Sequence, residues 1–458
     1  MNVLNRKITN IFFIFSITHL IIWTLLPTFT NNNLPLDVIE ALAWGSNLDW
    51  GFNKHPPFSA FAVELFYQIF GNRDWAFYLL SQIFVITAFI TIFKFAYEFF
   101  DNFYFAFLSI ILLEGIFFYN YTTPEFNVNI SQLPFWALTI YFSWRCIKHE
   151  KIFDYILLGL FMGLGFLSKY LFLYLILGIK FLFIYLIIKK KIKSFNFLLV
   201  GPVALIVIFP HLIWLFENDF ITLNYGFQRT GLEQNDFSDH FILPFLFIMK
   251  QIGILIPFFV MGYFLLKKID SKIVYDEKSI FLIFAFIIPI LLILLTSMII
   301  GVKIRTMWMT PFYLLAGVAF IQIFKKNIDF KKLNKFFFIF LTLFFLSPLT
   351  YIGVSVSNDF KRTDYEGKEI ARLVQNKWDD NFINEIKIVV GDEWFAGNLS
   401  YHLNSRPRWV IELKKNDTTK LKDNEGVIYT GNPKILKKIC PGVYGTIRPV
   451  GYCMIGKK

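Results

Sequence analysis

Eleven long apolar runs limit what this chain can fold into. A helix needs roughly 20 mostly apolar residues to cross the hydrocarbon core of a bilayer. The runs lie at residues 9–29, 76–97, 103–120, 131–147, 154–169, 171–188, 196–216, 241–266, 279–300, 307–324 and 336–356. Hydrophobic residues make up 56% of the chain, more than a water-facing surface tolerates. We therefore predict a mainly α-helical, polytopic membrane protein with about 11 membrane helices.

Lys and Arg placement predicts the orientation of these helices. With the N-terminus in the cytoplasm, nineteen Lys and Arg fall on the cytoplasmic side and six on the external side before residue 357. The positive-inside rule favours this arrangement. The net charge of +12 comes from short basic runs between spans, so no nucleic-acid partner is expected. The division into spans has least support at Ser168-Lys169-Tyr170, because almost no residues separate the predicted spans 154–169 and 171–188 there.

The composition of the chain changes after residue 356, and we predict two domains, 1–356 in the membrane and 357–458 outside it. Helical spacing predicts a helix over Tyr365–Trp378, and Ile386–Val390, Trp409–Leu413 and Gly426–Gly431 have the pattern of strands. A small C-terminal α/β domain on the external face follows. Heavy use of Phe, Ile, Lys and Asn indicates an AT-rich genome, so we expect a bacterial inner membrane and a periplasmic domain.

Two cysteines of the C-terminal domain flank a turn rich in Gly and Pro. Cys440 and Cys453 lie on the external side, where thiols can oxidise. A Cys440–Cys453 disulfide is the prediction, and two free buried thiols are the alternative. Cys146, at a cytoplasmic span end, is expected to be reduced.

The first external loop combines acidic, aromatic and basic side chains. If a helix begins near residue 37, Asp37 lies at its N-terminus, Glu40 one turn on, and Trp44 on the same side. Lys54 and His55 follow, before a Pro-Pro step. Such a loop can present an acid, an aromatic ring and a cation to one substrate. The alternative is that Asp37 caps the helix and Lys54 anchors to lipid headgroups.

These motifs carry a family resemblance. An Asp that opens the loop, a Trp-Gly seven residues on and a Gly-aromatic-x-Lys-His-Pro-Pro ending resemble the family 39 type of membrane glycosyltransferases. These enzymes share the GT-C fold with protein O-mannosyltransferases and the aminoarabinose transferase of lipid A. Further segments that agree are Tyr121–Asn129 with Trp136, Pro210–Trp214, Arg305–Pro311 and Gly391–Asn398. The resemblance implies a GT-C-type membrane domain with an interfacial helix, which residues 58–70 suit.

The resemblance also implies roles for individual residues. Asp37 matches the catalytic carboxylate, with Glu40 as a second candidate. Asp37 would act as general base towards a hydroxyl acceptor, or orient the acceptor or the sugar if the acceptor is a phosphate oxygen. A departing polyprenyl phosphate needs cations to stabilise it. The candidates for binding the donor phosphate are Lys54, His55, Arg229, Lys303 and Arg305. Headgroup anchoring is the alternative for Arg229 and Arg305.

A second group of polar and aromatic residues is expected on the substrate side. Its members are Trp44, Glu114, Glu125, Asn127, Asn129 and Trp308. Relatives place an Asp roughly where Asn129 stands, so Glu125 or Glu114 would substitute for it. A carboxylate inside a span, such as Glu114, is functional by default, and a helix contact is the alternative. No cluster has metal-ligand spacing and no Gly-rich phosphate loop occurs, so we expect neither a metal, a cofactor nor a nucleotide-sugar donor.

The predicted function is transfer of a sugar from a polyprenyl-phosphate donor, by inverting displacement, to an envelope acceptor on the periplasmic face. The partners expected are membrane lipid, the lipid-linked donor and lipid A. A protein or polysaccharide acceptor is the near alternative, and a transporter or flippase of a lipid-linked substrate is the alternative from another class. Against transport, the sequence has no related halves. A scaffold that binds a partner through its tail is a third option.

Overall fold

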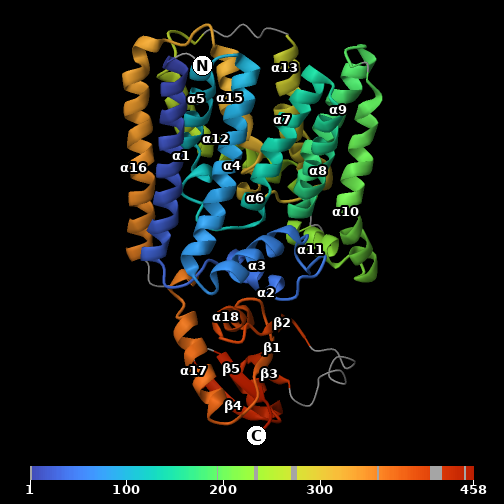
Figure 1. Cartoon of the computed structure of the whole chain (residues 1–458), viewed down its shortest axis with the longest axis vertical. Coiled ribbons are helices and arrows are strands. Elements are labelled where there is room, and N and C mark those ends of the chain that lie inside the picture. Colours follow the sequence, from blue (N-terminus) through green and yellow to red (C-terminus); the bar gives the residue numbers. More distant parts are fainter. Residues whose placement is uncertain are drawn as a thin grey trace.

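The computed structural model describes residues 3–192, 194–231, 236–269, 276–357, 361–412, 425–447 and 450–458. Long helices run side by side in a bundle, and a small sheet region lies beyond one end of it (Figure 1). The N-terminus and the C-terminal sheet lie at opposite ends of the bundle, as an odd number of crossings requires.

The described residues contain seven helical segments that are long and apolar enough to cross a membrane. Four of them are α1 (Val3–Thr30), α4 (Asp74–Phe100), α12 (Asp239–Tyr263), and α13 (Glu277–Leu282) continued by a π-helical turn and α14 (Ile288–Ile300). The other three are α9 (Leu173–Ile188), α10 (Val200–Glu217) and α16 (Leu333–Ser357), each lengthened at its start by a 3-10 turn: η3 (Tyr170–Phe172), η4 (Phe195–Leu199) and η9 (Phe330–Lys332). The other four predicted spans fall on shorter helices. These are α5 (Phe103–Ile111), α7 (Leu133–His149), α8 (Ile152–Ser168) and α15 (Ala316–Phe324). The prediction of a polytopic helical membrane protein is confirmed.

One predicted span is interrupted rather than continuous. The run over 103–120 forms α5, then the 3-10 helices η1 (Leu112–Gly115) and η2 (Phe117–Tyr119). The Cβ of a larger residue at Gly115 would lie 2.5 Å from the Cα of Phe258 in α12. The chain therefore turns where another helix passes closely, and apolar composition alone does not reveal this.

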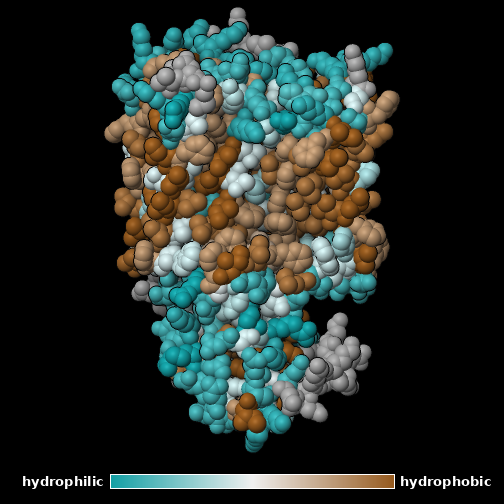
Figure 2. All heavy atoms as spheres, in the orientation of Figure 1, coloured by the Kyte–Doolittle hydropathy of each residue, from teal (hydrophilic) through white to brown (hydrophobic). Residues whose placement is uncertain are grey.

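The hydropathy of the surface changes along the length of the helix bundle. On the face drawn in Figure 2, a hydrophobic belt crosses the middle of the bundle, both ends are hydrophilic, and the sheet region is mostly hydrophilic. Exposed apolar side chains are favourable only against lipid, so the belt marks the membrane-embedded part.

The end of the bundle nearest the sheet carries short helices, and we call it the loop face. These helices are α2 (Leu36–Gly45), α3 (Phe58–Phe70), the single turn α6 (Val128–Ser131) and α11 (Ile221–Thr230). The predicted helix over 58–70 is present as α3, with Leu65 and Ile69 about 60% exposed on one side and Val63 buried on the other. A Cβ at Gly45 would lie 2.9 Å from the carbonyl oxygen of Ala60, so this glycine lets α2 and α3 pack closely.

The C-terminal region contains a five-stranded mixed sheet of order β2-β1-β3-β5-β4. Its elements are α17 (Gly367–Asp379), β1 (Ile386–Val390), α18 (Phe395–His402), β2 (Arg408–Val410), β3 (Gly426–Gly431), α20 (Pro433–Ile439), β4 (Val443–Ile447) and β5 (Val450–Ile455). Strand β1 pairs in parallel with β2 and β3, and β5 pairs antiparallel with β3 and β4.

The predictions for this region compare closely with these elements. The helix and the strands at Ile386–Val390 and Gly426–Gly431 are present. The third predicted strand, Trp409–Leu413, is present only as far as Val410, and its last residue, Leu413, lies outside the described residues. The β4–β5 hairpin was not predicted, because its glycines interrupt the alternation of apolar residues. The predicted disulfide between Cys440 and Cys453 is confirmed.

The sheet region is fastened to the loop face through α18. A Cβ at Gly397 would lie 3.1 Å from Cγ2 of Ile39 and 3.2 Å from Cβ of Ala43, so α18 packs directly on α2. The amide of Asn33 donates to Oδ1 of Asn398 at 2.8 Å. Helix α2 is thus held between the membrane bundle and the C-terminal region.

Candidate active site

Asp37 lies in the first turn of α2, in a position where burial and positive charge compete. Pro35 precedes it at the helix start, and the apolar side chains from Val38 to Trp44 pack into the core. Burial raises the pKa of Asp37, and the charges of Lys169, Lys54 and Arg229 act in the opposite direction. The carboxyl group of Asp37 thus faces several cations contributed by different parts of the chain.

Lys54 is paired more strongly than its position in the loop suggests. Its Nζ lies 2.8 Å from Oε1 of Glu40 and 3.2 Å from Oε1 of Glu393, which comes from the C-terminal region. Asn53 also donates to Glu393, at 2.9 Å. Two carboxylates therefore neutralise Lys54, and Glu40 is engaged in this pair rather than standing free beside Asp37.

His55 is a neutral ring in this arrangement. Burial, followed by the charges of Lys169, Lys54 and Arg229, lowers the pKa of His55 to about 3. Its ring packs edge-on against Trp44, with centroids 5.9 Å apart. Trp44 is buried and stacks on Phe52 at 5.6 Å. His55 can donate a hydrogen bond to a phosphate but carries no positive charge. Trp44 is part of the buried core and contacts His55 and Phe52 from there.

Two arginines reach the same region from α11 and from the loop after α14. Thr222 fastens α11 to the first loop through a 2.7 Å hydrogen bond to the carbonyl oxygen of Phe52. The amide of Lys303 donates to the carbonyl oxygen of Thr230 at 3.2 Å. These two contacts carry Arg229 and Arg305 to the site. Burial and the charge of Arg229 lower the pKa of Arg305, so the two guanidinium groups lie near each other.

Lys169 is the cation that sequence reasoning missed as a site residue. It follows α8 directly, is 6% exposed, and donates through Nζ to Oδ1 of Asn129 at 2.5 Å. The ammonium group also lies 5.0 Å from the ring centroid of Trp308. Asn129 and Trp308, predicted on the substrate side, therefore meet at this lysine. The available signal was a charged residue alone between two adjacent spans.

Glu125 is the second carboxylate next to Asp37. Its Oε1 accepts a hydrogen bond from the backbone N–H of Asp37 at 3.3 Å. Burial, and then the negative charge of Asp37, raise the pKa of Glu125 to about 8. Because the cations surround Asp37, we assign the negative charge of this pair to Asp37 and the proton to Glu125 at neutral pH.

This proton assignment predicts a pH-dependent stability. Glu125 has a folded pKa of about 8 against a reference value of 4.5, so its neutral carboxyl contributes stability that is complete below about pH 4.5 and lost as the pH rises through about 8. Glu125→Gln, which stays neutral, is expected to melt like the wild type near pH 4.5 and several degrees higher near pH 9. Thermal unfolding in detergent measures this. Glu366→Gln, an exposed glutamate, is the control; a Glu125→Gln difference that does not change with pH would contradict the assignment.

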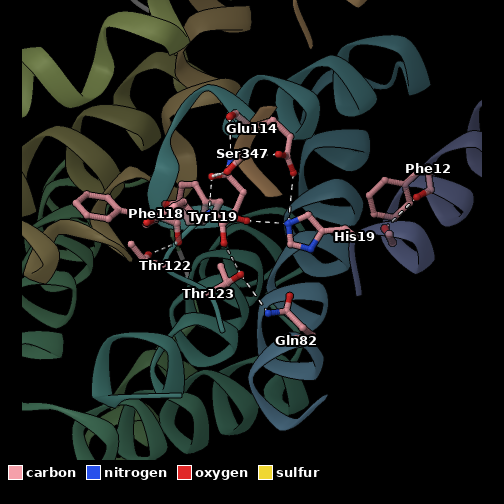
Figure 3. Close-up of polar contacts among 12 residues, drawn as sticks. Phe12, His19, Gln82, Glu114, Phe118, Tyr119, Thr122, Thr123 and Ser347 are labelled. Atoms are coloured by element: carbon pink, nitrogen blue, oxygen red, sulfur yellow. Dashed lines mark hydrogen bonds and ion pairs between the residues drawn. The ribbon is translucent and has the colours of Figure 1, made fainter. Parts of the chain in front are cut away.

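Glu114 does not reach Asp37 but lies in a buried polar network inside the bundle (Figure 3). Its Oε1 is 3.4 Å from Nε2 of His19, which also donates to the carbonyl oxygen of Tyr119 at 2.8 Å. Asn120 donates to Oε2 of Glu114 at 3.2 Å and to its carbonyl oxygen at 2.9 Å. Ser347 of α16 donates to Oδ1 of Asn120 at 3.0 Å.

The same network extends into the loop that carries Glu125. Thr123 donates to the carbonyl oxygen of Asn120 at 2.6 Å and accepts from Gln82 of α4 at 3.1 Å. Ser81 donates to the carbonyl oxygen of Thr123. Helices α4 and α16 and the 3-10 helix η1 thus hold residues 120–123, and through them the position of Glu125.

Replacing Asn120 tests how strongly the network holds this loop. Asn120→Ala would remove both hydrogen bonds to buried Glu114, leaving it only His19, and would leave the amide of Tyr121 without its partner. We expect a loss of about 3 kcal/mol in the free energy of unfolding. Ser347→Ala removes one hydrogen bond and is the graded control, with an expected loss of about 1 kcal/mol. Denaturant or thermal unfolding measures both. Equal effects for the two variants would show that Asn120 does not hold Glu114.

The remaining predicted residues take other positions. Asn127 caps α6, accepting from the amides of Asn129 and Ile130 at 2.9 and 3.2 Å. The side chain of Lys303 is exposed. Among the residues that the structure describes, no group of three His, Cys, Asp or Glu could hold a metal ion.

Comparison with known proteins bears on this site. The crystal structure of ArnT from Cupriavidus metallidurans bound to undecaprenyl phosphate superposes with a TM-score of 0.67 at 12% identity, covering 97% of this chain and 98% of that one. The apo structure of the same protein gives a TM-score of 0.53 with the same identity and coverage. The chain has the GT-C fold. A family model described as Dolichyl-phosphate-mannose-protein mannosyltransferase matches residues 54–214, and the predicted resemblance is confirmed. No curated protein matches the chain by sequence.

The match to this family model covers only part of the site. Residues 54–214 include Lys54, Glu125 and Lys169, whereas Asp37 precedes them and Arg229 follows. The fold is supported over nearly the whole chain, and the roles of individual site residues rest on the geometry described above.

Proposed function

We propose that this chain is a glycosyltransferase that transfers a sugar from a polyprenyl-phosphate donor to a phosphorylated envelope glycolipid, with lipid A as the expected acceptor. The reaction takes place at the periplasmic face of the bacterial inner membrane. The observation that carries the proposal is the buried carboxyl group of Asp37, which faces the charges of Lys169, Lys54 and Arg229 where the bundle meets the loop face.

The charges suit a phosphodiester leaving group. As the bond between the anomeric carbon and the phosphate oxygen breaks, negative charge grows on the departing phosphate, and preorganised cations stabilise it. Arg229 and Arg305 can supply this charge, since Lys54 is neutralised by Glu40 and Glu393. Lys169 adds to it in its protonated form, because burial lowers the pKa of Lys169 to about 7. Lys54 then orders the loop, and His55 offers a hydrogen bond.

A cavity beside these cations suits a polyprenyl chain. It has a volume of about 450 Å³ and is lined by Phe117, Lys250, Gly253, Ile254, Pro257 and Thr306. Thr306 follows Arg305 directly in the chain. An isoprenoid tail in this largely apolar cavity would place its phosphate at the arginine, without taking the tail out of the hydrophobic belt.

Asp37 acts on the other partner of the reaction. Towards a hydroxyl it takes up the proton as the oxygen attacks the anomeric carbon; towards an anionic phosphate oxygen it orients the sugar. Inverting displacement requires the attacking oxygen to approach from the side opposite to the leaving phosphate. The carboxylate therefore lies between a donor side, marked by the cations, and an acceptor side.

The experiment is transfer by the purified full-length protein in lipid nanodiscs. Undecaprenyl-phosphate-linked sugars serve as donors and lipid A as acceptor, and mass spectrometry detects a sugar added to lipid A. Addition to a protein or polysaccharide but not to lipid A would keep the enzyme class and change the acceptor. Movement of the donor across a proteoliposome membrane without chemical change would instead support a flippase.

A further inference from the structure

A second cavity lies where the outer ends of α1 and α16 meet the C-terminal region. It has a volume of about 350 Å³. Its polar and charged lining includes Asn31, Tyr121, Glu125, Tyr351, Lys361 and Arg362. Glu125 belongs to the site described above, and the charge of Arg362 also acts on Asp37 and Glu125. The hydrogen bonds from Asn31 to the hydroxyls of Tyr78 and Tyr351, both 3.0 Å, fix one wall.

This cavity and the cations of the donor side lie on opposite sides of the start of α2. In Figure 1, α1 and α16 lie at one side of the bundle and α10 and α11 at the other, with α2 between them. Pro35, Leu36 and Glu125 line the cavity, and Glu125 bonds to the backbone of Asp37. A molecule in the cavity therefore approaches Asp37 from the side away from Arg229.

The rim of the cavity is positively charged. Arg362 is exposed, its guanidinium lies 5.5 Å from the ring centroid of Trp394, and no hydrogen bond or ion pair joins it to a described residue. Lys361 donates to the carbonyl oxygen of Ser355 and lies 3.6 Å from Oδ1 of Asp364. Arg362 thus has free donors for a planar bidentate contact, which phosphate groups match.

The wall formed by α16 is open to lipid. Tyr351, Val354 and Ser355 line the cavity, whereas Leu349 and Val356 on the same turns are 62% and 70% exposed. A lipid can therefore place its headgroup in the cavity while its acyl chains stay against the hydrophobic belt. A soluble acceptor has no use for such a lateral opening, so the geometry favours a lipid.

We propose that this cavity binds the headgroup of a phosphorylated glycolipid acceptor, with Arg362 contacting a phosphate. Tyr121 and Tyr351, whose rings pack edge-on with centroids 5.6 Å apart, form one wall for a sugar ring. The inference rests on the proposed function for the identity of its ligand, and adds where the acceptor enters. It assigns separate entrances to the two lipids: donor beside α12, acceptor between α1 and α16.

Direct binding tests the proposal without requiring turnover. Full-length protein in nanodiscs is titrated with diphosphorylated lipid A and, separately, with undecaprenyl phosphate. Arg362→Ala is expected to raise the Kd for lipid A about tenfold and to leave that for undecaprenyl phosphate unchanged. Val354→Trp, which fills the cavity from its lipid side, is expected to act in the same direction. Arg372→Ala, an exposed arginine of α17 paired with Glu369, is the matched control.

Each outcome decides a different point. Unchanged lipid A binding in both variants overturns the proposal, and an equal increase in the Kd for undecaprenyl phosphate would assign the cavity to the donor. Equal affinity for dephosphorylated lipid A removes the role of Arg362. Transfer to a peptide that is lost in Arg362→Ala, with lipid A binding unchanged, would assign the cavity to a protein acceptor. A wild type that binds lipid A but transfers no sugar to any acceptor refutes the proposed function and leaves the cavity as a lipid site.

Discussion

Asp37→Asn is expected to lower kcat for sugar transfer about a thousandfold while leaving the Kd for undecaprenyl phosphate within roughly twofold of the wild type. The amide has nearly the same shape as the carboxylate, so the substitution removes charge and basicity without opening a cavity. It also removes the negative charge that the surrounding cations face.

The separation of kcat from donor binding is the informative part of this result. The phosphate of the donor is bound by cations that remain in Asp37→Asn, and the loss should appear in the chemical step. Asp49→Asn is the matched control, because Asp49 lies exposed in the same loop. Transfer at the wild-type rate by Asp37→Asn would refute the assigned role, and a weakened affinity for undecaprenyl phosphate would move Asp37 to donor binding.

Arg406→Ala is expected to have the largest effect on stability, a loss of about 3–5 kcal/mol in the free energy of unfolding. The guanidinium of Arg406 donates to Oε2 of Glu64 at 2.6 Å, to the carbonyl oxygen of Leu42 at 2.7 Å and to Oγ of Ser400 at 2.8 Å. It also lies 4.3 Å from the ring centroid of Tyr67. One side chain thus joins α2, α3 and the C-terminal region.

The reason for so large an effect is the charge that the substitution leaves behind. Glu64 is 4% exposed, and without Arg406 its carboxylate would be buried with only Gln68 as a partner. Thermal unfolding measures the loss, and protease cleavage between α16 and α17 would report detachment of the sheet region. Glu64→Gln with Arg406→Ala should recover part of the stability, whereas Arg372→Ala should change nothing measurable. An Arg406→Ala protein that melts like the wild type would show that this arginine does not attach the C-terminal region to α2 and α3.

Much of the fold could be predicted because its determinants are local. Apolar runs select membrane helices wherever they occur, and the short alternating segments near residues 386 and 426 select strands. The disulfide followed from two cysteines around one turn. The same local logic failed at Gly115, where a neighbouring helix breaks a span, and at the β4–β5 hairpin, whose glycines hide its pattern.

The composition of the candidate site depended on contacts between distant parts of the chain. The sequence by itself determined that Asp37, Lys54, Glu125 and Arg229 belong to the loops expected at one face of the membrane, because hydropathy and charge are read along the chain. Only the tertiary structure decided that Lys54 is neutralised by Glu393, that Glu125 rather than Glu114 meets Asp37, and that Lys169 faces the carboxylate. The physical reason is that charge pairing and desolvation depend on distances in space, which the packing of many helices sets together.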